Sequence, residues 1–223
     1  MKEYLFKVIA RIESDFPEKF GIPRQSGLIE ELAGQIVFEP EWRTADALRG
    51  IEDFDYLWLL WEFSANRRAR KSPTVRPPLL GGNQRMGVFA TRSPFRPNNL
   101  GLSCVRLDHV EWQSPQGPVI HVLGADLMDQ TPIYDIKPYL PYADAHPDAR
   151  GGFTDQQSWR RLNVIMSDQC AAMFTPEQLR ALIRTLELDP RPHYQDDPDR
   201  IYGLMFDGHD VHFRVRGDQL EVV

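Results

Sequence analysis

The segment Gln84–Ser103, QRMGVFATRSPFRPNNLGLS, carries the pattern around which the rest of the chain is organised. It begins with a short apolar stretch at 86–90, which predicts a strand, and it returns to apolar residues at Leu100. The polar loop between these stretches contains Pro94 and Pro97, whose rings fix φ and remove hydrogen-bond donors. The sequence therefore predicts a stiff loop that connects two strands of a β-rich fold.

Arg92 and Arg96 lie four residues apart in this loop, and each is close to a proline. A guanidinium group offers a planar fork of donors that matches carboxylate and phosphate oxygens. Gly101 follows the loop and permits a close backbone approach or a positive φ. We expect the loop to hold its arginines for a ligand with planar, polar or anionic parts.

Length and composition indicate a folded protein of one or two domains. The chain has 223 residues, of which 42% are hydrophobic and 26% charged. Cys104 and Cys170 are its two cysteines, and no CxxC pair exists that would predict a zinc site, so we expect no metal. The sequence also shows no signal peptide and no long apolar run, which favours the cytoplasm and excludes a membrane protein.

Positive charge is concentrated in one part of an otherwise acidic chain. The net charge is −6, yet the segment 63–107 contains no Asp or Glu and holds nine of the 26 Lys and Arg residues. Such a segment can bind a polyanion locally despite the sign of the whole protein. For the cluster at 67–71, a solvated surface loop is an equally good interpretation.

The first 140 residues predict about six or seven strands with little helix, which is typical of a closed or sandwiched β domain. The run at 55–63, DYLWLLWEF, is nearly continuous in apolar residues and predicts a strand buried on both faces. A helical pattern at 41–49 and a long polar connection at 64–83 interrupt the strands. The other strands are expected at 4–13, 35–39, 102–112 and 119–127.

The last part of the chain predicts a small α+β unit. A polar linker at 141–155 precedes a helix that begins after Thr175, with Pro176 in its first position and Gln178 closing a capping box, and that runs to about Glu187. A hairpin follows, turning at Asp207-Gly208. The fold class is therefore mainly β, with a closed or sandwiched β domain at 1–144 and an α+β subdomain at 155–223.

Acid–base groups are densest just after the strand expected at 119–127. Asp129 is followed by Asp135, Lys137 and Tyr139, and the first two of these three share one face of a strand. A structural ion pair between Asp135 and Lys137 is the alternative interpretation of that spacing. The chain lacks Walker, GxGxxG, GxSxG and HExxH motifs, so it resembles none of the corresponding enzyme classes.

Several long motifs, in order, resemble the TsaA-like tRNA methyltransferases. They are PRQSGL at 23–28, LRGIEDFDYLWLLWEF at 48–63, TVRPPLLGGNQRMGVFATRSPFRPNNLGLS at 74–103 and DLMDQTPIYDIKPYLPYAD at 126–144, with DPRPHY at 189–194. The resemblance implies a TsaA-like β-barrel that binds S-adenosyl-L-methionine, works as a homodimer and N6-methylates threonylcarbamoyladenosine at position 37 of certain tRNAs. The cofactor contacts that it implies are Ser26, Gly27, Leu28, Ala65, Asn66, Arg92, Leu102, Asp129, Gln130, Thr131 and Pro132.

The sequence departs from the family pattern in its DGTP and RPNP motifs and in the loop at 64–71, which reads SANRRARK and is more basic than expected. Gln130 replaces the glycine of DGTP, and it must avoid the φ that glycine allows or bear the strain. Asn99 replaces the second proline of RPNP.

Methyl transfer to N6 requires that a proton be removed from that nitrogen. We expect Asp135 or Tyr139 to accept it, with Lys137 lowering the pKa of the base or binding the threonyl carboxylate. Arg96 and Asn98 are assigned to positioning the substrate or the loop.

The anticodon loop of the tRNA is the expected partner. The residues predicted to contact its phosphates are Arg67, Arg68, Arg70, Lys71, Arg76 and Arg85. Two alternatives remain open at this stage: a non-catalytic module that binds nucleic acid or a nucleotide, and a methyltransferase with a small-molecule acceptor.

Overall fold

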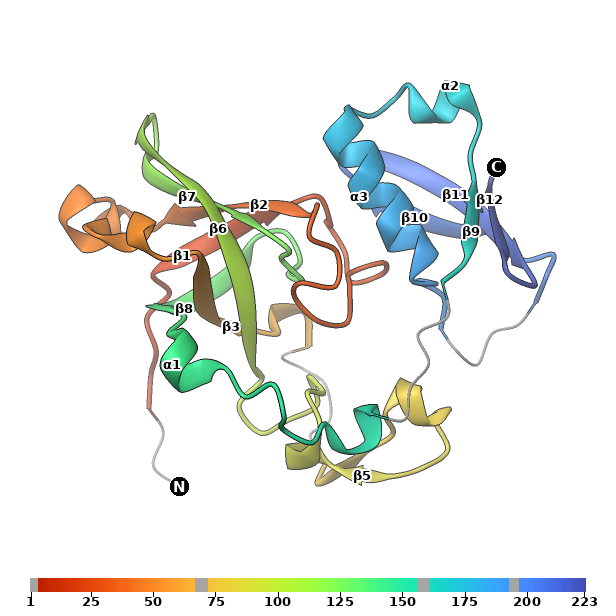
Figure 1. Cartoon of the computed structure of the whole chain (residues 1–223), viewed down its shortest axis with the longest axis horizontal. Helices are drawn as coiled ribbons and strands as arrows, with labels where there is room; N and C mark the ends of the chain where they lie inside the picture. The colour runs from red at the N-terminus through yellow and green to blue at the C-terminus, as the bar shows by residue number, and fades with distance from the viewer. Residues whose placement is uncertain (1–3, 67–71, 156–160, 193–196) are drawn as a thin grey trace.

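The computed structural model describes residues 4–66, 72–155, 161–192 and 197–223. Figure 1 shows two units, a barrel built from the first part of the chain and a smaller sheet with the helices α2 and α3 built from the last part. The mainly β fold with a small α+β part is thereby confirmed.

The barrel is antiparallel and closes in the strand order β1-β2-β7-β6-β3-β8. Closure leaves no free sheet edge, because the first and last strands pair with each other. Its strands are β1 (Ala10–Ser14), β2 (Ala33–Phe38), β3 (Tyr56–Glu62), β6 (Leu100–Ser114), β7 (Gly117–Leu123) and β8 (Thr131–Pro138).

Alternation along each strand fills the barrel with apolar side chains. In β3, Leu57, Leu59 and Trp61 are buried in the core, whereas Trp58 and Leu60 on the other face are half-buried. The prediction that this run is buried on both faces is therefore wrong, because a closed barrel has one interior face.

Other expected elements differ in extent. The strand predicted at 4–13 begins only at Ala10, and Leu5 before it is 99% exposed. The helical pattern at 41–49 forms short 3-10 helices, because Pro40 and Gly50 flank it closely. They are η1 (Pro40–Trp42), η2 (Ala45–Leu48) and η3 (Ile51–Asp53).

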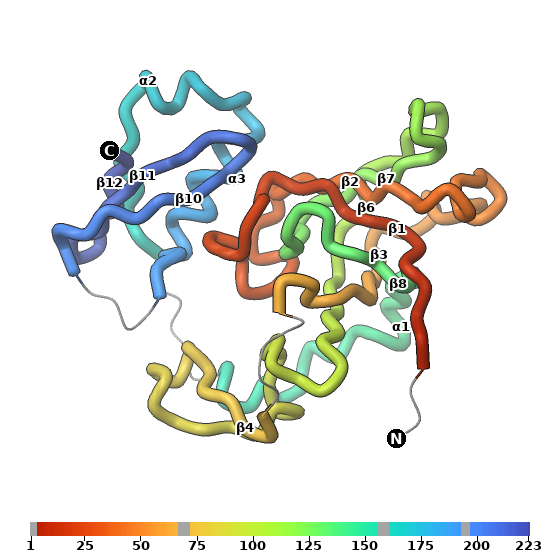
Figure 2. Tube along the Cα trace, turned by 180° about the vertical axis from the view of Figure 1, so that it is seen from behind, coloured from red at the N-terminus to blue at the C-terminus, as the bar shows by residue number. Residues whose placement is uncertain are grey.

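The long connection between β3 and β6 forms a lobe beside the barrel, coloured yellow in Figure 2. The strand predicted at 86–90 is shorter than expected, because the chain turns into a 3-10 helix at Val88, whose N–H donates to the carbonyl of Pro73 at 2.9 Å. The elements of this lobe are η4 (Ser64–Asn66), β4 (Thr74–Val75), η5 (Pro78–Leu80), β5 (Met86–Gly87) and η6 (Val88–Ala90).

The second unit packs helix α3 on a sheet of strand order β10-β11-β12-β9. The predicted capping box is present, since Thr175 accepts from the N–H of Gln178 and Gln178 accepts from that of Thr175. Asp207 and Gly208 both have positive φ, as the predicted hairpin turn requires. Its elements are β9 (Asn163–Ile165), α2 (Asp168–Ala171), α3 (Pro176–Glu187), β10 (Tyr202–Phe206), β11 (His209–Arg216) and β12 (Gln219–Val222).

The connection between the units carries α1 (Pro141–Asp144) and η7 (Gly152–Thr154). The domain boundary at 144–155 stays a prediction, because the hydrophobic cores do not divide there. The second core includes Phe16, Ile29 and Leu32 from the loop between β1 and β2. Within the described ranges, no helix is long and apolar enough to cross a membrane.

Candidate functional site

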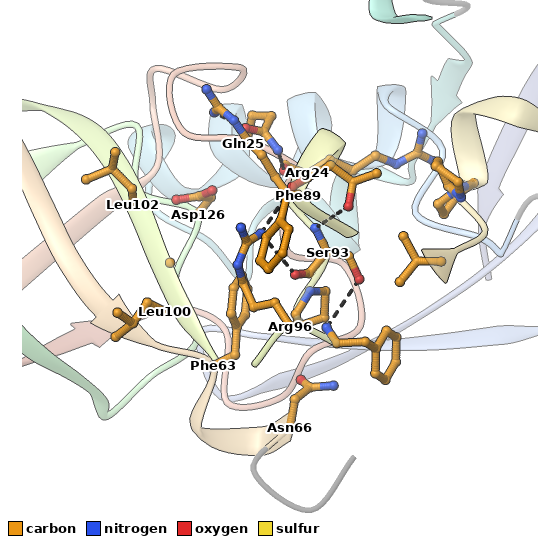
Figure 3. Close-up of a pocket in the computed structure, with 18 of the residues that line it drawn as sticks. Arg24, Gln25, Phe63, Asn66, Phe89, Ser93, Arg96, Leu100, Leu102 and Asp126 are labelled. Carbon is orange, nitrogen blue, oxygen red and sulfur yellow. Dashed lines mark hydrogen bonds between the residues drawn. The ribbon is translucent and has the colours of Figure 1, made fainter. Parts of the chain in front are cut away.

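A large cavity of about 1810 Å³ opens between the barrel and the yellow lobe. Residues from six stretches of the chain line it: 19–25, 60–66, 72–85, 89–102, 126–131 and 151–154. Figure 3 shows Leu100, Leu102 and Asp126 on the barrel side, with Arg96 and Phe89 near the centre. A cavity of this size exceeds what one drug-sized ligand needs, so it has room for two reactants.

The first wall is the loop that contains Pro23-Arg24-Gln25-Ser26. Ser26 Oγ accepts a hydrogen bond from the N–H of Cys104 at 3.1 Å, and the N–H of Gly27 donates to the carbonyl of Gly124 at 2.9 Å. Gly27 has a φ of 76°, and a Cβ on Gly124 would lie 3.3 Å from the Cα of Gly27. These contacts fasten the loop against β6 and the end of β7.

The second wall is the loop 91–99, which its own side chains hold in shape. Arg96 donates to the carbonyls of Thr91 and Ser93 at 3.1 and 3.4 Å, so much of its donor capacity is used within the loop. The side chain of Asn99 is buried and donates to the carbonyls of Pro94 and Asn66 at 3.1 and 3.3 Å. Asn99 has a φ of 47°, which the proline of the family pattern cannot adopt. The loop is therefore rigid, as its prolines predict.

Arg92 connects the two walls by donating a hydrogen bond to Gln25 Oε1. It also faces Asp126, and its charge acts to lower the pKa of that carboxyl group. The guanidinium group thus lies on the cavity lining with a carboxylate and an amide close to it.

Asp126 is a candidate that the sequence interpretation missed. Burial raises its pKa, and the hydrogen bond that Ser103 Oγ donates at 2.5 Å, the N–H of Ser26 and the charge of Arg92 oppose that rise. Ser103 Oγ in turn accepts from Trp61 Nε1 at 2.9 Å. A half-buried carboxyl group on a cavity wall with a shifted pKa is typical of functional sites. Its place three residues before Asp129 in the DLMDQTP motif is the signal that could have identified it.

The Asp129–Pro132 segment is divided between two faces of the molecule. Thr131 lines the large cavity, whereas Asp129 and Gln130 border a separate cavity of about 350 Å³. Asp129 Oδ1 accepts from the N–H of Ser14 at 3.1 Å, which fixes the segment to β1. Gln130 has a φ of 60°, so it adopts the conformation that glycine favours and bears the strain.

Asp135 and Lys137 form an ion pair of 3.0 Å, as the alternative interpretation of their spacing expected. Both side chains lie outside the cavity lining, on the outer face of the barrel, where Asp135 is directly opposite Leu60, itself a lining residue. Tyr139 packs against Tyr56 and Trp58 on the same face. The structure thus brings these groups beside the cavity but not into its wall.

The other predicted site residues fall into three groups. Ser26, Gly27, Leu28 and Pro132 lie outside the lining, and Arg67, Arg68, Arg70 and Lys71 lie outside the described residues. The predicted residues that line the cavity are Ala65, Asn66, Arg76, Arg85, Arg92, Arg96, Asn98, Leu102 and Thr131. Phe89, which the sequence did not predict as a site residue, also lies on the wall, and its side chain is 79% exposed.

Two family models match the chain. The model described as the tRNA-methyltransferase O N-terminal domain matches residues 11–145, and the TrmO C-terminal domain matches residues 160–223. These ranges cover the barrel and the second unit.

Individual relatives match over nearly the whole length. The tRNA (adenine(37)-N6)-methyltransferase of Escherichia coli K12 is 40% identical over 231 residues, which cover 100% of this chain and 97% of the relative. A Pseudomonas aeruginosa protein with the provisional name S-adenosylmethionine-dependent methyltransferase RcsF is 38% identical, covering 96% and 94%. The crystal structure of TrmO from P. aeruginosa superimposes with a TM-score of 0.79 at 33% identity, covering 100% and 96%.

Proposed function

The chain belongs to the tRNA-methyltransferase O family, and we propose that it transfers a methyl group from S-adenosylmethionine to N6 of adenine 37 in tRNA. The base that we propose as acceptor carries a threonylcarbamoyl group on N6. The observation that carries this proposal is the cavity where the 22–25, 60–66, 89–102 and 126–131 segments meet, since it combines cationic, acidic and apolar walls in one space.

The cavity residues fit the cofactor by charge and by polarity. The cofactor has a carboxylate, an ammonium group and a planar base, and the wall offers the Arg92 guanidinium, the Asp126 carboxyl group and the apolar surface of Leu100 and Leu102. S-adenosylmethionine supplies an electrophilic methyl group and leaves as a thioether. The protein's own task is therefore to hold the acceptor nitrogen in line and to exclude water.

The acceptor nitrogen must also lose its proton as the new N–C bond forms. We propose Asp135 or Tyr139 as the group that receives this proton, with Lys137, which is paired with Asp135 at 3.0 Å, placed to bind the threonyl carboxylate. Asp126 is a competing candidate, because it lies on the cavity wall itself and burial raises its pKa, which makes the carboxylate a stronger base. Arg96 shapes the loop around the acceptor, and Asn98 on the same lining is proposed to contact it.

We propose that the arginines of the cavity lining bind the RNA. Arg76 and Arg85 lie on the cavity wall and are proposed to contact phosphates of the anticodon loop, together with Arg67, Arg68, Arg70 and Lys71. Single-stranded loop bases can be splayed into such a cavity without breaking a duplex. We further propose that the protein acts in the cytoplasm as a homodimer.

The test of this function is a methylation assay with methyl-labelled S-adenosylmethionine. We expect label in N6-methylated threonylcarbamoyladenosine when the tRNA carries that group, and little label in tRNA made without it. Calorimetry that detects no cofactor binding would favour the non-catalytic module instead. Label that appears in a small molecule and not in tRNA would favour the third interpretation.

The same assay separates the candidate bases. Asp126→Asn and Asp135→Asn are compared at saturating cofactor, with cofactor binding measured for each by calorimetry. The variant that loses about 10²–10⁴-fold in turnover while still binding the cofactor identifies the proton acceptor. Full turnover by Asp135→Asn would leave Tyr139 and Asp126 as the candidates.

A further inference from the structure

We propose that the C-terminal unit is a positioning element for the cofactor loop, holding the wall formed by Pro23-Arg24-Gln25-Ser26 at the cavity. This inference rests on the proposed function and assigns to the second unit a role in cofactor affinity. The loop between β1 and β2 leaves the barrel at Asp15, enters the core of the second unit, and returns to the barrel at Ala33.

Phe16 is the deepest anchor of this loop. Its side chain is 1% exposed and meets Phe206 of β10 edge-to-face, with ring centroids 5.4 Å apart. Beside it, the N–H of Asp207 donates to the carbonyl of Asp15 at 2.9 Å. Backbone and side chain thus fix the start of the loop to one hairpin of the second unit.

The next anchors lie directly before the cavity wall. Phe20 stacks on Phe213 of β11 with centroids 6.4 Å apart, and a Cβ on Gly21 would come within 2.2 Å of Leu204 Cδ1. The neighbouring residues Lys19 and Ile22 line the cavity, and Ile22 also packs against the second core. One short stretch therefore touches both the second core and the cavity.

Charged groups continue the attachment. Burial lowers the pKa of the half-buried Arg24, and the nearby negative charge of Asp189 opposes that shift. Glu31 forms an ion pair of 3.7 Å with Arg184 of α3 near the end of the loop. Asp189 itself pairs with Arg191, Oδ1 to Nε, at 2.8 Å. The DPRP segment that follows α3 is thus placed next to the residue that enters the cavity wall.

The far side of the loop is fixed to the barrel through Ser26 and Gly27, as described above, and to the second wall through Gln25. The cofactor wall is consequently clamped between two units: the barrel holds Ser26 and Gly27, and the second core holds Phe16 and Phe20 before the wall and Ile29 after it. Preorganising a binding loop in this way increases affinity because less ordering occurs on binding. Loosening the attachment to the second unit should therefore weaken cofactor binding without changing a cavity residue.

Phe20→Ala tests this directly, because Phe20 is half-buried and does not line the cavity. We expect the dissociation constant for S-adenosylmethionine, measured by calorimetry, to rise about tenfold. The KM for the cofactor should rise in parallel while kcat at saturating cofactor stays near that of the parent protein. Phe20→Leu, which retains most of the apolar contact with Phe213, should restore most of the affinity.

The matched control is Val164→Ala on β9, which removes apolar contact from the same core at a distance from the loop. It should leave the dissociation constant within about twofold of the parent value, since it does not touch the loop. Equal affinity of Phe20→Ala and the parent protein, or an equal loss in Val164→Ala, would overturn the inference. A parent protein that does not bind the cofactor would overturn the proposed function instead.

Discussion

The two hydrophobic cores of this protein are assembled differently. The barrel core takes its members from barrel strands and the turns that join them, such as Ile12, Leu59 and Ile120. The second core combines α3 and its sheet with Phe16, Ile29 and Leu32 from the opposite end of the chain. The side chains of the barrel's own strands and turns fill the barrel core. The second core also needs side chains from the loop between β1 and β2.

Because of this difference, the order of residues along the chain does not show which residues pack and unfold together. The loop that completes the second core also forms a wall of the cavity, so folding of the second unit and shape of the cavity are coupled. Residues in one packed cluster respond together to mutation. Perturbations of the second core at residues that touch the loop should reach the cavity, and perturbations confined to the barrel's outer face should not reach the second core.

The largest expected effect follows from Phe206→Ala. The ring of Phe206 is fully buried between Phe16 and Phe174, so its removal should lower the free energy of unfolding by about 3–5 kcal/mol. Limited proteolysis should then cut the loop between Asp15 and Leu32 faster than in the parent protein. The measurements are urea unfolding and mapping of the cleavage sites.

Leu59→Ala in the barrel core is the comparison variant. It should cost about 2–5 kcal/mol as well, yet leave the loop as protected as in the parent protein at temperatures where the fold is intact. If both variants expose the loop equally, the two cores act as one cooperative unit and the contrast between them is wrong.

The elements that the sequence predicted correctly are those decided within a few residues. Thr175 and Gln178 form their capping box locally, and Asp207-Gly208 sets the hairpin turn without help from the rest of the chain. The strand patterns predicted a closed or sandwiched β domain, and the resemblance to the TsaA-like family selected the barrel. The strand expected at 86–90 is shortened to Met86–Gly87, because the chain turns into η6, where the N–H and Oγ1 of Thr91 donate to the carbonyl of Val88 at 3.2 and 2.9 Å.

The candidate site was predictable only in part. Its loops are rich in proline, glycine and arginine, so their composition marked them in advance. Asp126 was missed because the hydrogen bonds that link it to Ser103, and Ser103 to Trp61, join residues that are not neighbours in sequence. The contact of Phe16 with Phe206 joins the ends of the chain, and no local pattern encodes such a pairing.

The next expected effect is on the stability of the fold, and it depends on pH through Asp15, which lies where the chain passes from the barrel to the second unit. Burial, and next the nearby charge of Asp207, raise the pKa of Asp15 from its ordinary value of 3.8 to about 6. Because the folded state binds this proton more tightly, the stability associated with Asp15 is complete below about pH 4 and is lost as the pH rises through about 6.

Asp15→Asn should remove this loss. We expect the variant to be more stable than the parent protein by roughly 1–2 kcal/mol at pH 7.5, a figure reduced from the full shift because Asp15 is partly solvent-exposed. At pH 4 the two should unfold at nearly the same urea concentration. Glu13 and Asp129 border the same small cavity, so Glu13→Gln serves as a control for the general charge of the region. A gain that is independent of pH would rule out the titration of Asp15 as its cause.

The smallest expected effect is in the barrel, at Gln130. Its φ of 60° is disfavoured for a residue with a Cβ, and the backbone holds it there through the bond from its N–H to the carbonyl of Ile12 at 2.7 Å. Gln130→Gly should relieve the strain and raise the free energy of unfolding by about 0.5–1 kcal/mol, after allowance for the greater freedom of glycine in the unfolded chain. Gln130→Ala keeps the strain and should give no gain. Equal stability of the glycine and alanine variants in urea unfolding would mean that the side-chain contact with Asp129, and not the backbone, decides the residue at this position.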